Sequence, residues 1–300
     1  MTLLDRPAPA PSIDLLTARV SGRRRVTDLL ATGALTLSFF VALVPLALVI
    51  WLVVSKGAGI LSWDFLTADI PRQFRAIGPG MGPAVAGTLV ITGAASAMAI
   101  PLGILGAIYL NEFGGHGVLA RLIRFMSDVM TGVPSIVMGL FIYVVWVRRF
   151  ETQSGFAGAL ALACLMLPIV IRTTDEMLKL VPEELRQGSV ALGARSLRTT
   201  MSVVIPTALP GIVSGAMLAV ARAAGETAPL IFTISVVNTA NWSLSGANTS
   251  LSAQIFRNAS QPFPGAQDRA WGAALTLVLL VFVLTFIARF VAGRFTLKHQ

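Results

Sequence analysis

Long hydrophobic blocks separated by short polar segments dominate the pattern of this 300-residue chain. A helix that crosses the hydrocarbon core of a bilayer needs about 20 mainly apolar residues, and blocks of that length recur along the whole chain. The predicted spans are residues 29–54, 84–110, 125–147, 155–171, 205–237 and 271–291. The first block is too long for the core of a signal peptide and no convincing cleavage site follows it, so we expect it to remain as an anchor.

This pattern predicts an all-α, polytopic membrane protein with about six transmembrane helices. Only 12% of the residues are charged, about half the share of an ordinary soluble domain. The composition therefore excludes a soluble enzyme and a disordered protein. Cys164 is the single cysteine of the sequence, which excludes a disulfide scaffold.

Small residues and prolines inside the predicted spans indicate where helices approach one another and where they bend. Gly103 and Gly106 are one turn apart, and Gly211 and Gly215 have the same kind of spacing, which allows close helix contact. Prolines inside the spans predict kinks or breaks at Pro101, Pro134 and Pro168.

The basic residues set the expected orientation. The net charge of +9 would also suit nucleic-acid binding. However, Lys and Arg stand at the ends of apolar blocks, as they do when they determine membrane topology. With six spans and the N-terminus inside, 15 of the 23 Lys and Arg fall in inside segments and 7 in outside segments, with Arg222 left within a span. The chain is therefore predicted to be a multi-pass protein of the cytoplasmic (inner or plasma) membrane with both termini cytoplasmic.

Catalytic chemistry has no support in the sequence. No phosphate-binding loop, nucleophile elbow or His-Glu-x-x-His motif occurs. His116 and His299 are the only histidines and lie far apart, so no metal site is predicted. Ser135 and Ser214 lack a histidine partner within the spans and are expected to form local helix hydrogen bonds. No catalytic residue is predicted.

The polar inside segment 175–204 is longer than a turn between two spans requires. It is predicted to form two short helices around a turn, with Pro182 at the first position of a helix and Glu183 and Glu184 in its first turn. Gly193 allows a sharp change of direction. Such a helix suits either docking in the groove of another protein or resting on lipid, and the pattern alone leaves both open.

The spacing in this segment resembles the EAA loop of ABC importer permeases. Gln187-Gly188-Ser189, three residues, Gly193, nine residues and then Val-Val-Ile-Pro206 match the family's spacing, although Gln187 stands where the family has Glu. The resemblance implies a type I (MetI-like) permease fold and a coupling helix that sits in a cleft of the ATPase subunit. It assigns the ATPase-coupling role to Glu183, Glu184, Arg186, Gln187, Gly188, Ser189 and Gly193.

Further blocks resemble the PstA family, the permeases of phosphate-specific ABC importers. They are residues 132–141, 172–174, 180–182 and 221–230, the last containing Gly-Glu-Thr-Ala-Pro. The resemblance implies a second permease resembling PstC, two ATP-binding subunits resembling PstB and an extracytoplasmic phosphate-binding protein resembling PstS. It implies no cofactor in this chain, because ATP and Mg are bound by the partner subunits.

Arg222 and Glu226 stand four residues apart in an apolar run, which on a helix places them one turn apart on one face. An Arg at mid-membrane costs about 2.5–3.5 kcal/mol, and such residues by default mark substrate paths. A pair that merely neutralises itself is the alternative, but buried pairs gain little over apolar residues. The guanidinium fork matches an oxyanion, and Thr227 adds a hydroxyl donor. The predicted substrate pathway is Arg222, Glu226 and Thr227.

These features predict a permease subunit of an ATP-driven importer that translocates inorganic phosphate by alternating access. The alternatives are a permease for sulfate or molybdate, or an ATPase-independent channel or secondary transporter. The predicted organisation is a cytoplasmic tail (1–28), a first transmembrane helix with an extracytoplasmic segment (29–83), a permease core (84–291) with the coupling loop (175–206), and a cytoplasmic tail (292–300).

Overall fold

The structure is a computed structural model that describes residues 22–296 except 77, 79 and 116. The parts of the predicted tails in residues 1–21 and 297–300, and both histidines, lie outside the described residues. Every regular element in the described part is helical, in agreement with the predicted all-α class. The chain divides into two compact units, with the boundary between Trp51 and Leu52. Most of α1 (Gly22–Gly57) therefore belongs to the first unit.

The second unit carries the remaining helices, which the structure bounds as follows. They are α2 (Trp63–Thr67), α3 (Gly82–Ile108), α4 (Val118–Gly132), α5 (Ser135–Ile142), α6 (Arg148–Phe150), α7 (Gly155–Lys179), α8 (Glu183–Ala191), α9 (Ser196–Thr199), α10 (Ile205–Gly225), α11 (Ala228–Thr233), α12 (Leu251–Ala259) and α13 (Pro264–Thr296). Three π-helical turns join some of them, namely η1 (Tyr109–Phe113), η2 (Tyr143–Val147) and η3 (Thr200–Val204).

Five described helical runs are long and apolar enough to cross a membrane, and a bent pair makes a sixth if it counts as one span. They are Gly22–Gly57, Gly82–Phe113, Gly155–Lys179, Ser196–Gly225 and Pro264–Phe290. This confirms the predicted number of about six.

The third predicted span is wrong as a single helix. Residues 125–147 fall on α4 and on the run Ser135–Phe150, which are bent by 108° at the break before Pro134. Val133 and Pro134 both have extended backbone, because proline disfavours the helical conformation of the residue before it. The break predicted at Pro134 is confirmed, whereas α3 and α7 continue as helices through Pro101 and Pro168.

The fifth predicted span, residues 205–237, is also interrupted. Helix α10 ends at Gly225, and Glu226 leaves the helix with φ −71° and ψ 127°. A new short helix, α11, starts at Ala228 with Pro229 in its first turn, where a missing N–H is tolerated. The remaining residues of the predicted span, 234–237, are not helical. Hydropathy alone cannot reveal this break, because the apolar run continues across it.

Helix α7 packs between α3 and α10 through the predicted glycines. A methyl group added to Gly103 would lie 2.7 Å from Val170 Cγ1, and one added to Gly211 would lie 2.3 Å from Met177 Sδ. The close helix approaches expected there are therefore confirmed. Buried apolar side chains of α3, α7, α10 and α11 fill the main core around them, including Ile91, Leu162, Met166, Ala219 and Leu230.

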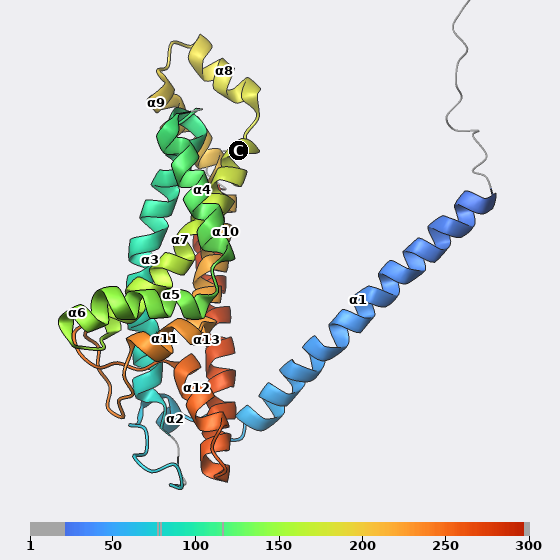
Figure 1. Cartoon of the computed structure of the whole chain (residues 1–300). Coiled ribbons are helices and arrows are strands. Elements are labelled where there is room, and N and C mark those ends of the chain that lie inside the picture. Colours follow the sequence, from blue (N-terminus) through green and yellow to red (C-terminus); the bar gives the residue numbers. More distant parts are fainter. Residues whose placement is uncertain (1–21, 77, 79, 116, 297–300) are drawn as a thin grey trace, which may run out of the picture. The chain divides into compact units, whose positions relative to one another are not determined.

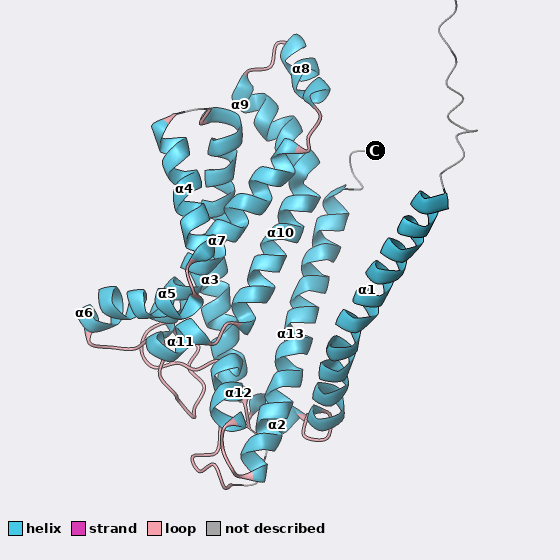
Figure 2. Cartoon of the chain, turned by 45° about the vertical axis from the view of Figure 1, so that its right-hand side comes forward, coloured by secondary structure: helices cyan, strands magenta, loops and turns pink. Residues whose placement is uncertain are grey.

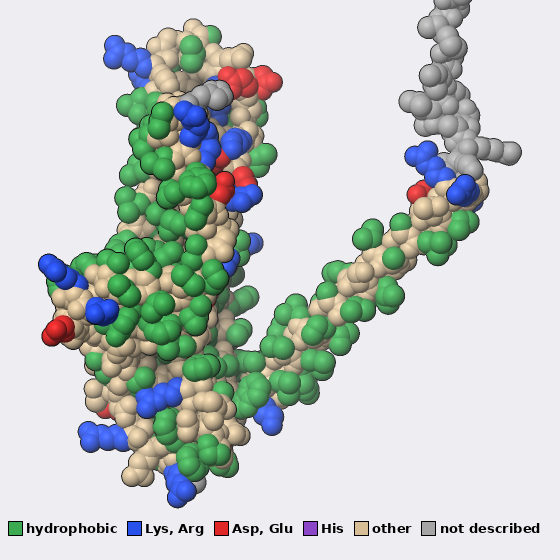
Figure 3. Space-filling model, viewed as in Figure 1, with side chains coloured by type: hydrophobic (Ala, Val, Ile, Leu, Met, Phe, Trp, Pro, Cys, Tyr) green, Lys and Arg blue, Asp and Glu red, His purple; other side chains and the backbone are tan. Residues whose placement is uncertain are grey.

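Within the second unit, α3, α7, α10 and α13 run side by side, and α5 crosses them (Figures 1 and 2). Helices α8 and α9 lie at one end of these long helices, and α2 and α12 lie at the other. Hydrophobic side chains cover the visible face over α4 and α5, while charged side chains lie toward the two ends and at the corner formed by α6 (Figures 1 and 3). This arrangement suits a bundle that crosses a bilayer and exposes one polar segment at each side.

Candidate coupling loop and substrate pathway

Helix α8 begins where the sequence predicted a helix, one residue after Pro182. Pro182 is the N-cap rather than the first helical residue, and Glu183 and Glu184 occupy the first turn. Their negative charges face the positive end of the helix dipole. Gly193 has φ +86°, a conformation that residues with a side chain rarely adopt. The predicted turn at Gly193 is therefore confirmed.

The second of the two short helices predicted in this segment does not form as a separate helix. Helix α9, η3 and α10 form one continuous helical run from Ser196 to Gly225. Likewise, residues 175–179 belong to the end of α7. The loop outside the long helices is therefore shorter than predicted, and α8 is its only separate helix in the described structure.

The surface of α8 and the following turn is unusually apolar for a segment outside the bundle. No residue of α8 is buried. Leu192 is 91% exposed, and Leu185, Val190 and Leu197 are exposed as well. Contiguous exposed apolar side chains of this kind mark interaction surfaces. Glu183, Glu184, Gln187 and Gly188 share this exposure.

Arg186 and Ser189 differ from the other predicted coupling residues because they face the rest of the chain. The Arg186 guanidinium forms an ion pair with Glu112 of η1, and its Nη2 donates to the carbonyl of Leu178 at 2.8 Å. The hydroxyls of Ser189 and Thr199 are 2.9 Å apart. Sequence analysis missed Glu112, whose only signal was a carboxylate at the end of an apolar span.

The Arg222–Glu226 pair exists, but not on one continuous helix. Arg222 Nε lies 3.5 Å from Glu226 Oε1, although Glu226 is already outside α10. The Arg222 side chain is 64% exposed in this chain, whereas that of Glu226 is 21% exposed. The Glu226 carbonyl accepts a hydrogen bond of 3.0 Å from the Ser252 hydroxyl of α12. The backbone at the break is therefore hydrogen-bonded to α12, while the Arg222 guanidinium is left exposed.

The exposed residues of α10 fall on one face of the helix. Thr207, Ser214, Leu218, Arg222 and Gly225 are exposed, at intervals of seven, four, four and three residues. The Thr207 and Ser214 hydroxyls donate to backbone carbonyls one turn earlier, as predicted for Ser214. Because those two hydroxyls are bonded within the helix, Arg222 is the group on this face that does not suit lipid, and it points to a protein or aqueous neighbour.

The helices that follow the two breaks pack against each other. Helix α5 packs on α11 so closely that a methyl group on Gly139 would be 2.5 Å from Pro229 Cα. Segments 132–141 and 221–230, which are far apart in sequence, are therefore neighbours in space. Broken helices in a membrane are tolerated where the irregular backbone is buried in protein or lines a cavity.

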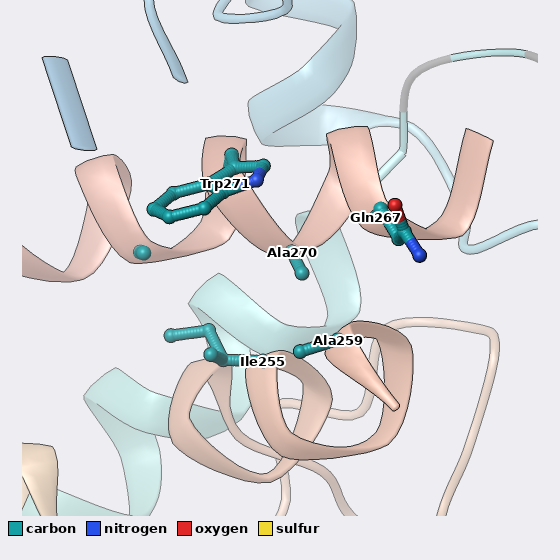
Figure 4. A pocket seen from close by; sticks show the side chains of 6 residues that line it. Ile255, Ala259, Gln267, Ala270 and Trp271 are labelled. Atoms are coloured by element: carbon teal, nitrogen blue, oxygen red, sulfur yellow. The ribbon is translucent and has the colours of Figure 1, made fainter. Parts of the chain in front are cut away.

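A hollow of about 600 Å³ opens beside the second break. Gly225 and Thr227 line it together with Ser252 and Ser260 of the α12 region. A smaller hollow of about 340 Å³ lies between α12 and α13, where Ile255 and Ala259 face Ala270 and Trp271 (Figure 4). No charged residue lines either hollow. Of the two, only the larger one is lined by a residue of the predicted pathway, Thr227.

The chain matches the family model described as "Binding-protein-dependent transport system inner membrane component" over residues 99–297. It is 40% identical to "Phosphate transport system permease protein PstA 1" of Mycobacterium tuberculosis, over 97% of this chain and 96% of that protein. It is also 40% identical to the PstA protein of Yersinia pestis, over 87% of this chain and 89% of that protein.

Solved structures support the same fold. A bacterial ABC transporter involved in the import of the acidic polysaccharide alginate matches with a TM-score of 0.59 at 14% identity, over 90% of this chain and 96% of that chain. An inward-facing MetNI methionine ABC transporter matches with a TM-score of 0.55 at 19% identity, over 72% of this chain and 94% of that chain. At these identities the likeness concerns the fold alone.

The agreement of family model, relatives and fold identifies the role of the chain. It is a multi-pass inner-membrane permease subunit of an ABC importer, a transport component rather than an enzyme, which works with an ATPase and a binding protein. The chain belongs to the family of binding-protein-dependent transport system inner membrane components, and within it to the PstA permeases.

Proposed function

We propose that this chain translocates inorganic phosphate by alternating access, as one half of a pore completed by a second permease resembling PstC. Relatives at 36–40% identity over most of the chain carry the name of phosphate transport permeases. The observation that carries the proposal is the exposed guanidinium of Arg222 on the exposed face of α10, next to the helix break.

Arg222 suits an oxyanion for a physical reason. A guanidinium presents a planar fork of donors that binds phosphate bidentately, and a pathway of low dielectric constant strengthens the contact. Glu226 repels an anion, so its role is to hold Arg222 at 3.5 Å and compete for it when no anion is bound. This competition lets phosphate pass without being trapped. Thr227 supplies a hydroxyl at the edge of the adjacent hollow.

The exposed face of α8 and its turn is the proposed contact with one of the two ATP-binding subunits resembling PstB. Leu185, Val190 and Leu192 supply apolar contact area, and Glu183, Glu184 and Gln187 supply polar contacts. ATP and Mg are bound by those partners, and this chain contributes no cofactor site. A phosphate-binding protein resembling PstS delivers the anion at the opposite end, where α2 and α12 lie.

Transport by the complete complex in vesicles tests the substrate. We expect phosphate uptake that requires ATP and the phosphate-binding protein, and phosphate-stimulated ATP hydrolysis. Sulfate and molybdate are the matched controls, each tested with the same complex and with a binding protein of its own specificity. Stimulation by sulfate or molybdate and not by phosphate would assign the chain to another oxyanion, the nearest alternative substrate class.

A further inference from the structure

Glu112 belongs neither to the proposed substrate pathway nor to the proposed contact with the ATPase. It lies on η1, the π-helical end of α3, and its side chain is only 8% exposed. Its ion-pair partner, Arg186, comes from α8, 74 residues later, and is 17% exposed. Both charges are therefore largely removed from water at the end of the bundle where the coupling loop begins.

Two further hydrogen bonds extend this pair to neighbouring elements. The Leu178 carbonyl, near the end of α7, accepts from Arg186 Nη2 at 2.8 Å. The second carboxylate oxygen of Glu112 accepts from the hydroxyl of Thr200 on η3 at 3.2 Å. One ion pair thus connects α8 with the ends of α3, α7 and the run that continues as α10.

The contacts of α8 make this connection important. Since no residue of α8 is buried, apolar packing does little to fix the helix on the bundle. The other side-chain bond from α8, between Ser189 and Thr199, leads to α9 rather than to α3. A directional, hydrogen-bonded ion pair fixes orientation, which apolar contact of the same area does not.

The energetics favour a role beyond stability. A buried ion pair seldom stabilises a fold more than well-packed apolar residues would, because both charges lose their hydration. Glu112 lies on one π-helical turn, η1, and accepts from Thr200 on another, η3. Such turns are frequent at functional sites. The arrangement suits a joint that transmits movement.

We propose that Glu112 and Arg186 form the joint that makes the coupling loop and the membrane end of α3 move as one body. Movement imposed on α8 by the ATPase subunits then reaches α3 directly, in addition to the covalent path through α9 and α10. Both are positioning residues. The inference rests on the proposed contact between α8 and the ATPases.

The test measures ATP hydrolysis and anion uptake in the same vesicles, with complete complexes carrying E112Q, R186Q or both. We expect the uptake per ATP hydrolysed to fall about fivefold or more for each single variant, while hydrolysis continues. The double variant should lose no more than either single variant, because all three lack the same joint. R186K keeps the charge without the planar fork, so it should restore part of the ratio.

The control is E176Q, which removes the exposed Arg172–Glu176 pair of α7, where the atoms are 3.3 Å apart and the side chains are 65% and 54% exposed. It should leave the ratio unchanged. An unchanged ratio in E112Q would contradict the proposed joint. Equal loss of hydrolysis and uptake in R186K, with the complex fully assembled, would contradict it as well. If phosphate fails to stimulate the unmodified complex, the proposed substrate is wrong. The ratio is then measured with sulfate or molybdate, whichever stimulates, so the two failures remain distinct.

Discussion

Two arginines of this chain differ in whether the guanidinium is bonded within the chain or left exposed. Arg186 is 17% exposed, and its partners lie within the chain: Glu112, the Leu178 carbonyl and, at 3.7 Å, Glu183. Arg222 has one loose contact of 3.5 Å and is 64% exposed. A cation that is open on a spanning helix needs an external partner to offset its desolvation. In the proposed function, an anion on the transport path is that partner.

The first prediction concerns Arg222. Arg222→Ala should abolish phosphate uptake and leave assembly of the complex intact, because the side chain makes little contact within the chain. Arg222→Lys should restore uptake only partly, since an ammonium lacks the bidentate fork. Uptake by vesicles and co-purification of the subunits measure the two effects.

Arg149→Ala is the matched control, because Arg149 is an exposed arginine at the end of α6. Its uptake should equal that of the unmodified complex. Normal uptake by Arg222→Ala would remove this residue from the mechanism.

At the scale of elements, the breaks before Pro134 and at Glu226 convert two predicted spans into bent paths. Proline explains the first break and was visible in the sequence. The second follows a glycine and precedes a Thr-Ala-Pro segment, and the apolar composition on both sides hid it. The contact between α5 and α11 then brings together the helices that follow the two breaks, which neither segment encodes locally.

The contact between these breaks gives a stability prediction. Gly139→Ala should lower the free energy of unfolding by about 1–3 kcal/mol, because the added methyl group meets backbone 2.5 Å away that cannot move aside cheaply. A lower thermal-unfolding midpoint of the purified complex measures the effect.

Gly132→Ala serves as the control, since a methyl group there meets no atom within 4 Å. Its midpoint should stay near that of the unmodified complex. Equal midpoints for both variants would mean that α5 and α11 separate easily.

At the scale of the whole molecule, the positive-inside bias and the position of α8 support the same orientation. The coupling loop must face the ATPases, which hydrolyse ATP in the cytoplasm. The segment between α11 and α12 then faces the opposite side. Cytoplasmic termini are therefore part of the proposal.

Cysteine accessibility tests this orientation. In a Cys164→Ser background, Ser243→Cys should react with a membrane-impermeant thiol reagent added to intact cells. Arg121→Cys, at the start of α4, should react only after permeabilisation. Both side chains are exposed, so access depends on the side of the membrane. The reversed pattern would place α8 outside and would exclude its contact with the ATPases.

The sequence by itself determined the class of fold, the number of spans and the position of the coupling loop. These depend on composition and local spacing, as in the apolar blocks and the Gly193 turn, because a bilayer selects long apolar helices whatever their neighbours are. It also placed Arg222 near Glu226. The predicted domain boundaries and the roles of these residues stay predictions.

Only the tertiary structure decided which distant residues meet. The pairing of Glu112 with Arg186, the contact of Gly139 with Pro229 and the bond from Ser252 to the Glu226 carbonyl join segments that are 26 to 90 residues apart. Such contacts depend on the packing of whole helices against α7, and no periodicity along the chain records them. For the same reason, the end of α10 at Gly225 is not evident from the sequence, because the break depends on contacts such as the bond from Ser252 of α12 to the Glu226 carbonyl.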